Sequence, residues 1–503
     1  MRMRTAATAV LLIALAVMVL DLLVAQRVPL DHRFHWDGTY YLNYARAPFQ
    51  IFWSRDIDPY SLSRIAPSLI VHLLVRVSGL DLSNQSILLG FSILNFACIL
   101  AAIGIFYQLC IRLELSSHQL LLGCAALFLN FCFLKYNSFY PITTDVCSFT
   151  VGLAMLSAYL VGSTGALVLL TITGAFVWPL LPLIGAILIA LPSEAASGQP
   201  RRATISIEAN ASRLRTRLLL GTASGLAVVA AASYVHYVSG FRHPGTPPLD
   251  WLAPLSIVVA GAYIGACVTL LIDPAFEIRR LIDHLPFYAR RIALAGVVLA
   301  LAMLPLWLLA SRPPRNNPAL FLQALLDTST RAPGIFLVAH FAFFGPIVAL
   351  ASCCFTPLCG TIRRWGPGMV AVALLTIILS LGAESRQMMA NLAFIAVPAI
   401  AAWRTPRRPR LFLLLFCAIA LATSRVWIIL DLDRLEFTYE SYLQYPWQWF
   451  FGAIGYWMTW DIYLIHLGGL LATLIAVMAF RSDADWSAQE PTRRELVEGA
   501  APP

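Results

Sequence analysis

Long apolar runs separated by short charged breaks dominate the sequence. Since a helix needs about 20 apolar residues to cross a bilayer, these runs predict membrane-crossing helices. Two runs are short and flank Trp178-Pro179, so they form either two crossings or a pair of half-helices. The predicted helices lie at 6–25, 87–107, 119–134, 147–162, 164–175, 180–191, 216–238, 252–272, 291–310, 333–354, 367–382, 388–402, 411–429 and 460–480. We therefore expect an all-α, polytopic transmembrane bundle.

The composition supports this class. The chain has 503 residues, of which 59% are apolar and 12% are charged. Soluble domains carry about 25% charged residues. The remaining apolar surface must face lipid. The first apolar run follows two arginines and is too long for a typical signal peptide, so we interpret it as an uncleaved helix, with cleavage after Ala25 as the alternative.

The basic residues predict the orientation. The net charge is +9, and Lys135 is the only lysine among 35 basic residues. This arginine bias is typical of a GC-rich bacterial genome. The arginines lie in short loops, which favours the positive-inside rule over nucleic-acid binding. We expect a bacterial plasma-membrane protein with both termini cytoplasmic, a transmembrane domain at 1–480 and a disordered tail at 481–503.

The first outer loop, 26–86, is the richest polar stretch. It mixes acids, bases and aromatic residues, a composition that suits a substrate with a polar head and a lipid tail. The alternative is an aromatic belt with surface ion pairs. The part at 61–80 is apolar with a few basic residues and predicts an interfacial amphipathic helix. The polar residues include Asp31, His32, Arg33, His35, Asp37, Tyr41, Arg55, Asp56, Asp58 and Arg64.

Two further outer loops are polar. One runs from Lys135 to Asp145, where Asp145 begins a helix that Thr143 or Thr144 could cap. The other holds Glu384 and Arg386, which could form an interfacial ion pair.

The span interiors carry few ionisable residues. His340 and His466 are interpreted as packed histidines, and Arg425 near a helix end is expected to reach outward as surface charge. The predicted polar residues thus gather on one face of the membrane. A transporter tends to place such groups near the midplane instead. Cys353, Cys354 and Cys359 have no partner with metal-site spacing, so we expect no metal and no cofactor.

The motifs resemble the GT-C superfamily of membrane glycosyltransferases, which take sugars from polyprenyl-phosphate carriers. The likeness rests on Trp36-Asp37-Gly38 with Tyr40-Tyr41, on Pro59-Tyr60 to Arg64 and Pro67, on Pro141 to Asp145, and on Glu384 with Arg386. It extends over the whole predicted topology.

The resemblance implies a mechanism. A loop-one acid, Asp37 or Asp56, would take the proton of an acceptor hydroxyl, and polyprenyl phosphate would leave. Asp31 is a third option for this base, less favoured because it follows the first helix directly. Arg64 and Arg386, with Arg55 and Lys135, would stabilise that phosphate. His35, Tyr41, Asp145 and Glu384 complete the predicted substrate-binding residues. Partners would be a polyprenyl-phosphate-linked sugar, a glycan, lipid or protein acceptor, and membrane lipid, with no nucleic acid. The alternatives are a transporter or lipid flippase, and a non-catalytic assembly protein.

Overall fold

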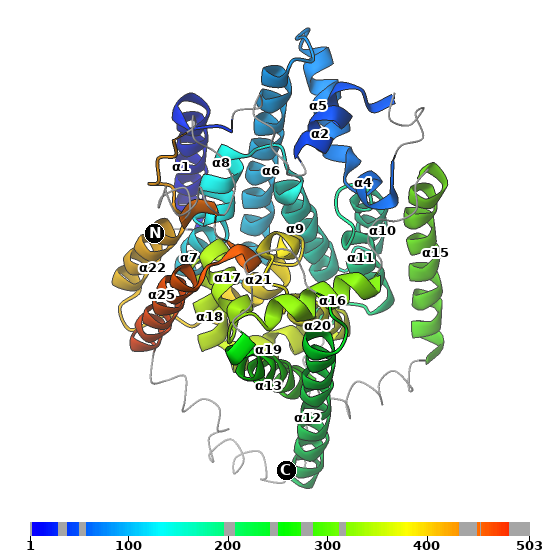
Figure 1. The fold of residues 1–503 in the computed structure, drawn as a ribbon, viewed down its shortest axis with the longest axis vertical. Coiled ribbons are helices and arrows are strands. Elements are labelled where there is room, and N and C mark those ends of the chain that lie inside the picture. The colour runs from blue at the N-terminus through cyan, green and yellow to red at the C-terminus, as the bar shows by residue number, and fades with distance from the viewer. Residues whose placement is uncertain are drawn as a thin grey trace, which may run out of the picture.

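The computed structural model describes residues 3–28, 38–49, 57–195, 207–241, 250–272, 285–310, 318–431, 450–452 and 454–481. Within these ranges every regular element is helical, and none is a strand. Figure 1 shows the helices as one bundle, and many of their apolar side chains form a common buried core. The all-helical class predicted from the apolar runs is therefore confirmed.

Six described helices are long and apolar enough to cross a membrane. They expose large aliphatic side chains: Leu12 and Leu23 on the first helix, for example, are 62% and 78% exposed. Such surface is compatible with lipid and not with water. The chain is a multi-pass membrane protein. The six helices are α1 (Met3–Val24), α6 (Asn84–Arg112), α12 (Ile207–Tyr237), α13 (Ala253–Leu271), α15 (Leu285–Leu309) and α25 (Trp460–Ala479).

The remaining predicted crossings are shorter or broken in the described structure. The run at 119–134 becomes α7 (Ser117–Phe128), η1 (Cys132–Tyr136) and α8 (Asn137–Phe139), bent by 55°. The run at 333–354 divides at Gly345, whose φ is +69°, and Pro346, giving α17 (Ile335–Phe344) and α18 (Ile347–Cys353). Further helices are α9 (Asp145–Val161), α10 (Thr164–Gly174), α11 (Leu181–Ala190), α16 (Pro318–Ser329), α19 (Phe355–Trp365), α20 (Pro367–Leu379), α21 (Ala393–Ala402) and α22 (Pro409–Thr423).

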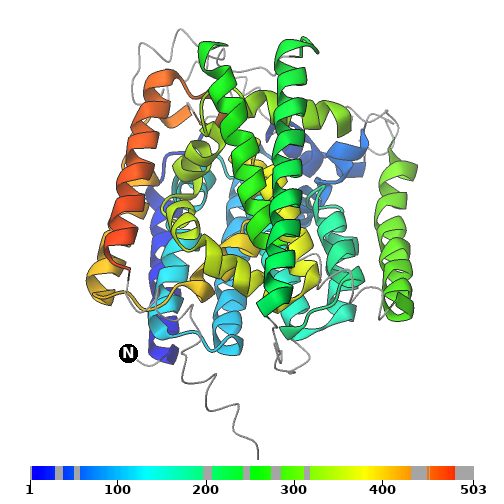
Figure 2. The ribbon, with the colours of Figure 1, turned by 90° about the horizontal axis from the view of Figure 1, so that it is seen from below.

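Glycines let α12 and α13 approach closely. Gly221 and Gly225 on α12 face Gly261 and Gly265 on α13, and a Cβ at Gly225 would lie 2.7 Å from the Gly261 carbonyl oxygen. Small residues at this spacing allow backbone contact between membrane helices. The two helices run side by side in Figure 2.

Three short helices follow the first span: α2 (Gly38–Arg46), α4 (Pro59–Leu62) and α5 (Ile65–Val77). A ring nitrogen of His72 on α5 lies 2.7 Å from the Ala45 carbonyl oxygen on α2. On α5, Val71 is fully buried whereas Val77 is 87% exposed, so this helix is two-faced. Figure 1 shows α2, α4 and α5 together at the top of the molecule. We call the end of the bundle that carries α2 and the first residues of α9 the α2 end.

Candidate functional site

The structure describes six of the ten predicted site residues. His35, Asp37, Arg55 and Asp56 lie outside the described residues. The described ones are Tyr41, Arg64, Lys135, Asp145, Glu384 and Arg386, and all are buried or half-buried.

An ion pair joins two of the predicted residues. Asp145 is the first residue of α9, and Arg386 lies in the 3-10 turn η4 (Ser385–Met388). The Arg386 Nε donates to the Asp145 Oδ2 at 3.2 Å, and the side chains are 17% and 1% exposed. The Arg386 guanidinium also lies 5.4 Å from the ring centre of Tyr136. A carboxylate so deeply buried needs this cation, because an isolated charge cannot leave water cheaply.

The second oxygen of Asp145 is buried without a hydrogen bond. Its Oδ1 is fully enclosed, and no group in the described residues donates to it. The expected cap is also missing: Thr144 occupies the N-cap position, but its buried hydroxyl makes no hydrogen bond. Thr143, the other predicted cap, does not occupy the N-cap position. Buried polar groups without a partner are rare, so Asp145 has an acceptor available for a donor from outside the chain.

Side chains from other helices hold the segment before Asp145 in place. Asn95 on α6 donates through one amide nitrogen to the Asn137 side-chain oxygen and to the Pro141 carbonyl oxygen, both at 2.8 Å. On α9, Gly152 packs against the Ala390 carbonyl oxygen so closely that a Cβ there would lie 2.1 Å from it. These contacts fix α9 against the segment between α20 and α21, which carries Arg386.

A hydrogen bond links the start of α2 to the same place. The Gly38 backbone N–H donates to the Tyr140 hydroxyl at 2.9 Å, across 102 positions. The rings of Tyr140 and Tyr136 are 6.1 Å apart, and Tyr136 lies beneath Arg386. The residue directly after Asp37 is therefore connected by contacts to the Asp145–Arg386 pair.

Glu384 occupies the N-cap position of η4, two residues before Arg386. Its Oε2 accepts a hydrogen bond from the Gln387 amide at 2.6 Å. Burial, together with the Glu384 charge, raises the pKa of Tyr456 to about 12, while Arg386 acts in the opposite direction. The segment η6 (Gly455–Trp457) thus borders this region.

A second buried ion pair reaches Tyr456, and the sequence analysis missed it. Arg331 Nη2 lies 3.4 Å from Asp327 Oδ2, with side chains 5% and 2% exposed. Arg331 Nη1 donates to the Tyr456 carbonyl oxygen at 2.8 Å. Asp327 is on α16 and Arg331 lies two residues after this helix ends, so the acid and base are four positions apart just before an apolar run. This spacing could have predicted the ion pair from the sequence.

Arg64 is packed between two aromatic rings. Its guanidinium lies 4.1 Å from the ring centres of both Tyr60 and Trp178, and its Nη1 donates to the Tyr41 hydroxyl at 3.0 Å. The residue is only 5% exposed. In this arrangement Arg64 joins α2, α4 and the break between α10 and α11. Its described contacts are therefore structural.

Lys135 and Arg425 are both buried beside the segment that follows α22. The Lys135 Nζ donates to the Ile428 carbonyl oxygen at 2.6 Å. Arg425 was expected to reach outward, and this expectation is wrong. It is fully buried, has φ +56°, and its Nη2 lies 2.9 Å from His466 Nε2. Its guanidinium stacks near the rings of Phe131 and Phe450, which explains how a cation can remain inside the bundle.

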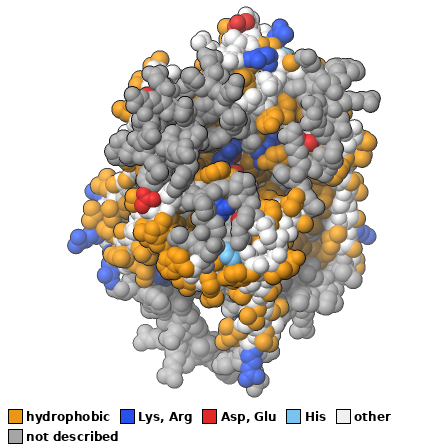
Figure 3. Space-filling model, viewed as in Figure 1, with side chains coloured by type: hydrophobic (Ala, Val, Ile, Leu, Met, Phe, Trp, Pro, Cys, Tyr) orange, Lys and Arg blue, Asp and Glu red, His pale blue; other side chains and the backbone are white. Residues whose placement is uncertain are grey.

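Figure 3 shows a hollow in the middle of the face seen in Figure 1, with basic, acidic and hydrophobic side chains visible inside it. Among the described residues, no three histidine, cysteine, aspartate or glutamate side chains lie together in a way that could hold a metal ion. The described polar side chains around the Asp145–Arg386 pair include arginine, carboxylate and tyrosine groups. Such a set can bind phosphate and hydroxyl groups.

Comparisons with protein-family models, with curated proteins and with solved structures find no match to this chain. The functional argument therefore depends on the residues and their geometry.

Proposed function

We propose that this chain is a membrane glycosyltransferase that moves a sugar from a polyprenyl-phosphate carrier to an acceptor hydroxyl. The observation that carries the proposal is the meeting of three distant segments. Gly38, which follows Asp37, contacts Tyr140, and the pair Asp145–Arg386 lies one tyrosine away. These are the segments whose motifs resemble the GT-C superfamily.

Each group has a role in the proposed reaction. Asp37 or Asp56 takes the proton of the acceptor hydroxyl as the oxygen attacks the anomeric carbon, with inversion at that carbon. Arg386, which pairs with Asp145 and lies near the ring of Tyr136, stabilises the charge that develops on the departing phosphate. Asp145 accepts a hydrogen bond from a sugar hydroxyl through its unpartnered oxygen.

The membrane setting suits a lipid-linked donor. The polyprenyl tail lies in the bilayer beside the exposed aliphatic surface of the spans, while the phosphate and sugar reach the α2 end. The arginine distribution favours an outer location for this end and cytoplasmic termini in a bacterial plasma membrane. The acceptor is a glycan, a lipid or a protein.

Transfer of a labelled sugar from the lipid carrier to an acceptor tests the proposal. Purified full-length protein in liposomes is given a panel of polyprenyl phosphates bearing radiolabelled hexoses or pentoses, with a cell-envelope extract as acceptor. Asp37→Asn and Asp56→Asn are compared with Asp81→Asn, a control for an exposed acid of the same loop. We expect one of the first two variants to lose about 10²- to 10⁴-fold in transfer and the control to retain wild-type rate. Wild-type transfer by both Asp37→Asn and Asp56→Asn would refute the proposed base.

A further inference from the structure

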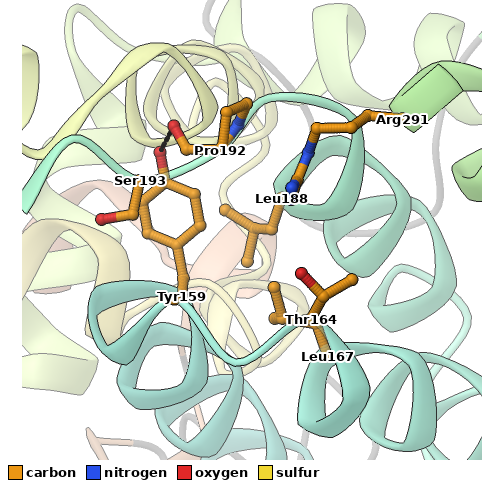
Figure 4. A pocket seen from close by; sticks show the side chains of 8 residues that line it. Tyr159, Thr164, Leu167, Leu188, Pro192, Ser193 and Arg291 are labelled. Carbon is orange, nitrogen blue, oxygen red and sulfur yellow. Dashed lines mark hydrogen bonds between the residues drawn. The ribbon is translucent and has the colours of Figure 1, made fainter. Parts of the chain in front are cut away.

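A cavity of about 220 Å³ lies at the opposite end of α9 from Asp145. Tyr159, which lines it, is 14 positions further along α9, or roughly 20 Å at about 1.5 Å per residue. Figure 4 shows the Arg291 side chain reaching in from α15 and the Thr164 side chain from the start of α10. Leu167 and Leu188 form apolar parts of the wall.

The cavity offers donors for an anion. Arg291 Nε donates to the Ile189 carbonyl oxygen at 2.8 Å, and no carboxylate lies within ion-pair distance of Arg291 among the described residues. The two Nη groups are therefore available for a ligand. The Thr164 hydroxyl makes no hydrogen bond within the described part of the chain. Thr164 is also the first residue of α10, where the helix dipole places partial positive charge, while Ser163 caps the helix by accepting a hydrogen bond from the Ala166 N–H.

Size and surroundings indicate which anion fits. Pockets that enclose whole small-molecule ligands measure about 300–1000 Å³, so this one suits a single headgroup. On α15, apolar side chains are exposed along the whole helix, from Phe287 at 51% and Val297 at 56% to Leu308 at 73%. α15 stands at the edge of the bundle in Figure 1 and packs on α10 and α11. Acyl chains could lie along this surface while the headgroup enters the cavity.

Arginines and one carboxylate both lie at this end of the bundle, since Glu194 follows Ser193 and acts electrostatically on Tyr159. The Tyr159 hydroxyl donates to the Pro192 carbonyl oxygen at 3.0 Å, and the Ser193 hydroxyl donates to the Trp365 carbonyl oxygen at 3.4 Å. Arg363 and Arg364 directly precede Trp365 at the end of α19. The positive-inside rule predicts that this arginine-rich end is cytoplasmic, where bilayers carry anionic lipid.

We propose that this cavity binds the phosphate of an anionic phospholipid, with Arg291 and Thr164 as its ligands and the acyl chains against α15. The site is separate from the α2 end, and the inference does not depend on the proposed transferase activity.

Native mass spectrometry of the full-length protein in detergent tests this inference. Phosphatidylglycerol is titrated against phosphatidylcholine with the same acyl chains, and inorganic phosphate is added as a competitor. Arg291→Gln is compared with Arg290→Gln, which removes the same charge from an exposed neighbouring position on α15. We expect Arg291→Gln to weaken the first phosphatidylglycerol binding step about tenfold and Arg290→Gln to leave it within twofold.

Three results would overturn the inference. These are equal losses in the two arginine variants, equal binding of phosphatidylcholine, and displacement of the lipid by inorganic phosphate at the same concentration, which would indicate a free-phosphate site. Arg291→Gln could also unfold the protein, because Arg291 bonds Ile189. Thr164→Val then decides, since its hydroxyl supports no described contact. Weaker phosphatidylglycerol binding by this variant supports the site, and wild-type binding rejects it.

Discussion

Asp145 and Arg386 are separated by 241 positions and form an ion pair of 3.2 Å at the α2 end of the bundle. The pair joins the start of α9 to the turn that precedes α21. Asp145 is the more deeply buried partner, with 1% of its side chain exposed against 17% for Arg386. This asymmetry has consequences for stability that can be measured.

We expect Arg386→Gln to be more destabilising than Asp145→Asn. The first change leaves a buried carboxylate without its cation, which typically costs about 3–5 kcal/mol, whereas the second leaves a partly exposed arginine that can reach water. The double variant Asp145→Asn/Arg386→Gln should recover part of the loss, because neither charge remains. Thermal unfolding of the four proteins in detergent measures this order. Additive losses in the double variant would show that the pair is not energetically coupled.

Gly152→Ala tests whether the packing of α9 matters to the site without changing a polar group. The added methyl would lie 2.1 Å from the Ala390 backbone oxygen, and backbone cannot rotate away as a side chain can. We expect a lower melting temperature and reduced sugar transfer, because the added methyl group forces α9 to move relative to the segment that carries Arg386. Gly104→Ala is the matched control, since a Cβ there meets nothing within 4 Å. It should be neutral or stabilising by up to about 1 kcal/mol. Equal behaviour of the two variants would contradict the close approach.

Arg64→Lys separates a phosphate-binding arginine from a structural one. Lysine keeps the charge but cannot stack flat between Tyr60 and Trp178, so a structural Arg64 predicts a loss of about 1–2 kcal/mol in stability. Arg76→Lys on α5 is the control, because Arg76 is exposed. Melting temperature and the KM for the lipid-linked sugar are measured together. An unchanged melting temperature with a raised KM would instead assign Arg64 to the substrate.

The sequence predicts the helices better than their contacts. Apolar runs locate α6 and α25 to within a few residues, because bilayer thickness sets a length that the pattern reveals. The break at Gly345-Pro346 was missed, since the surrounding run is long enough to cross without it. Whether a charged residue is buried depends on which helices surround it. The position of Arg425 near a helix end predicted exposure, whereas Phe131 and Phe450 from distant segments enclose it.

In the candidate site, too, the sequence predicted the positions of residues better than the contacts between them. The topology predicted from the arginine distribution placed Asp145 and Arg386 on the same side of the membrane, but only the fold shows that they touch. Asn95, which holds the turn before Asp145, lies within an apolar run and gave no signal. By contrast, the four-residue spacing of Asp327 and Arg331 could have been recognised from the sequence.

Arg331 offers a last test of the polar groups at the α2 end. Arg331→Leu removes the cation beside Asp327, which is 1% exposed, and also removes the donor to the Tyr456 carbonyl oxygen. We expect a loss of about 3–5 kcal/mol, because a buried carboxylate loses the cation that pairs with it and a backbone acceptor loses the Arg331 donor.

Arg331→Lys should retain part of this stability by preserving the charge, and Asp327→Asn/Arg331→Leu should be more stable than Arg331→Leu alone because no charge remains buried. Thermal unfolding in detergent ranks the variants. Sugar transfer at a temperature below all the melting points then separates structure from chemistry. Arg331 lies beside Tyr456, which borders Glu384 and Arg386, so the fully folded Arg331→Lys variant should lose activity only if this edge of the site contacts substrate. If Arg331→Leu melts at the wild-type temperature, the buried pair contributes nothing to the fold, and the charge argument made for Asp145 and Arg386 would need revision as well.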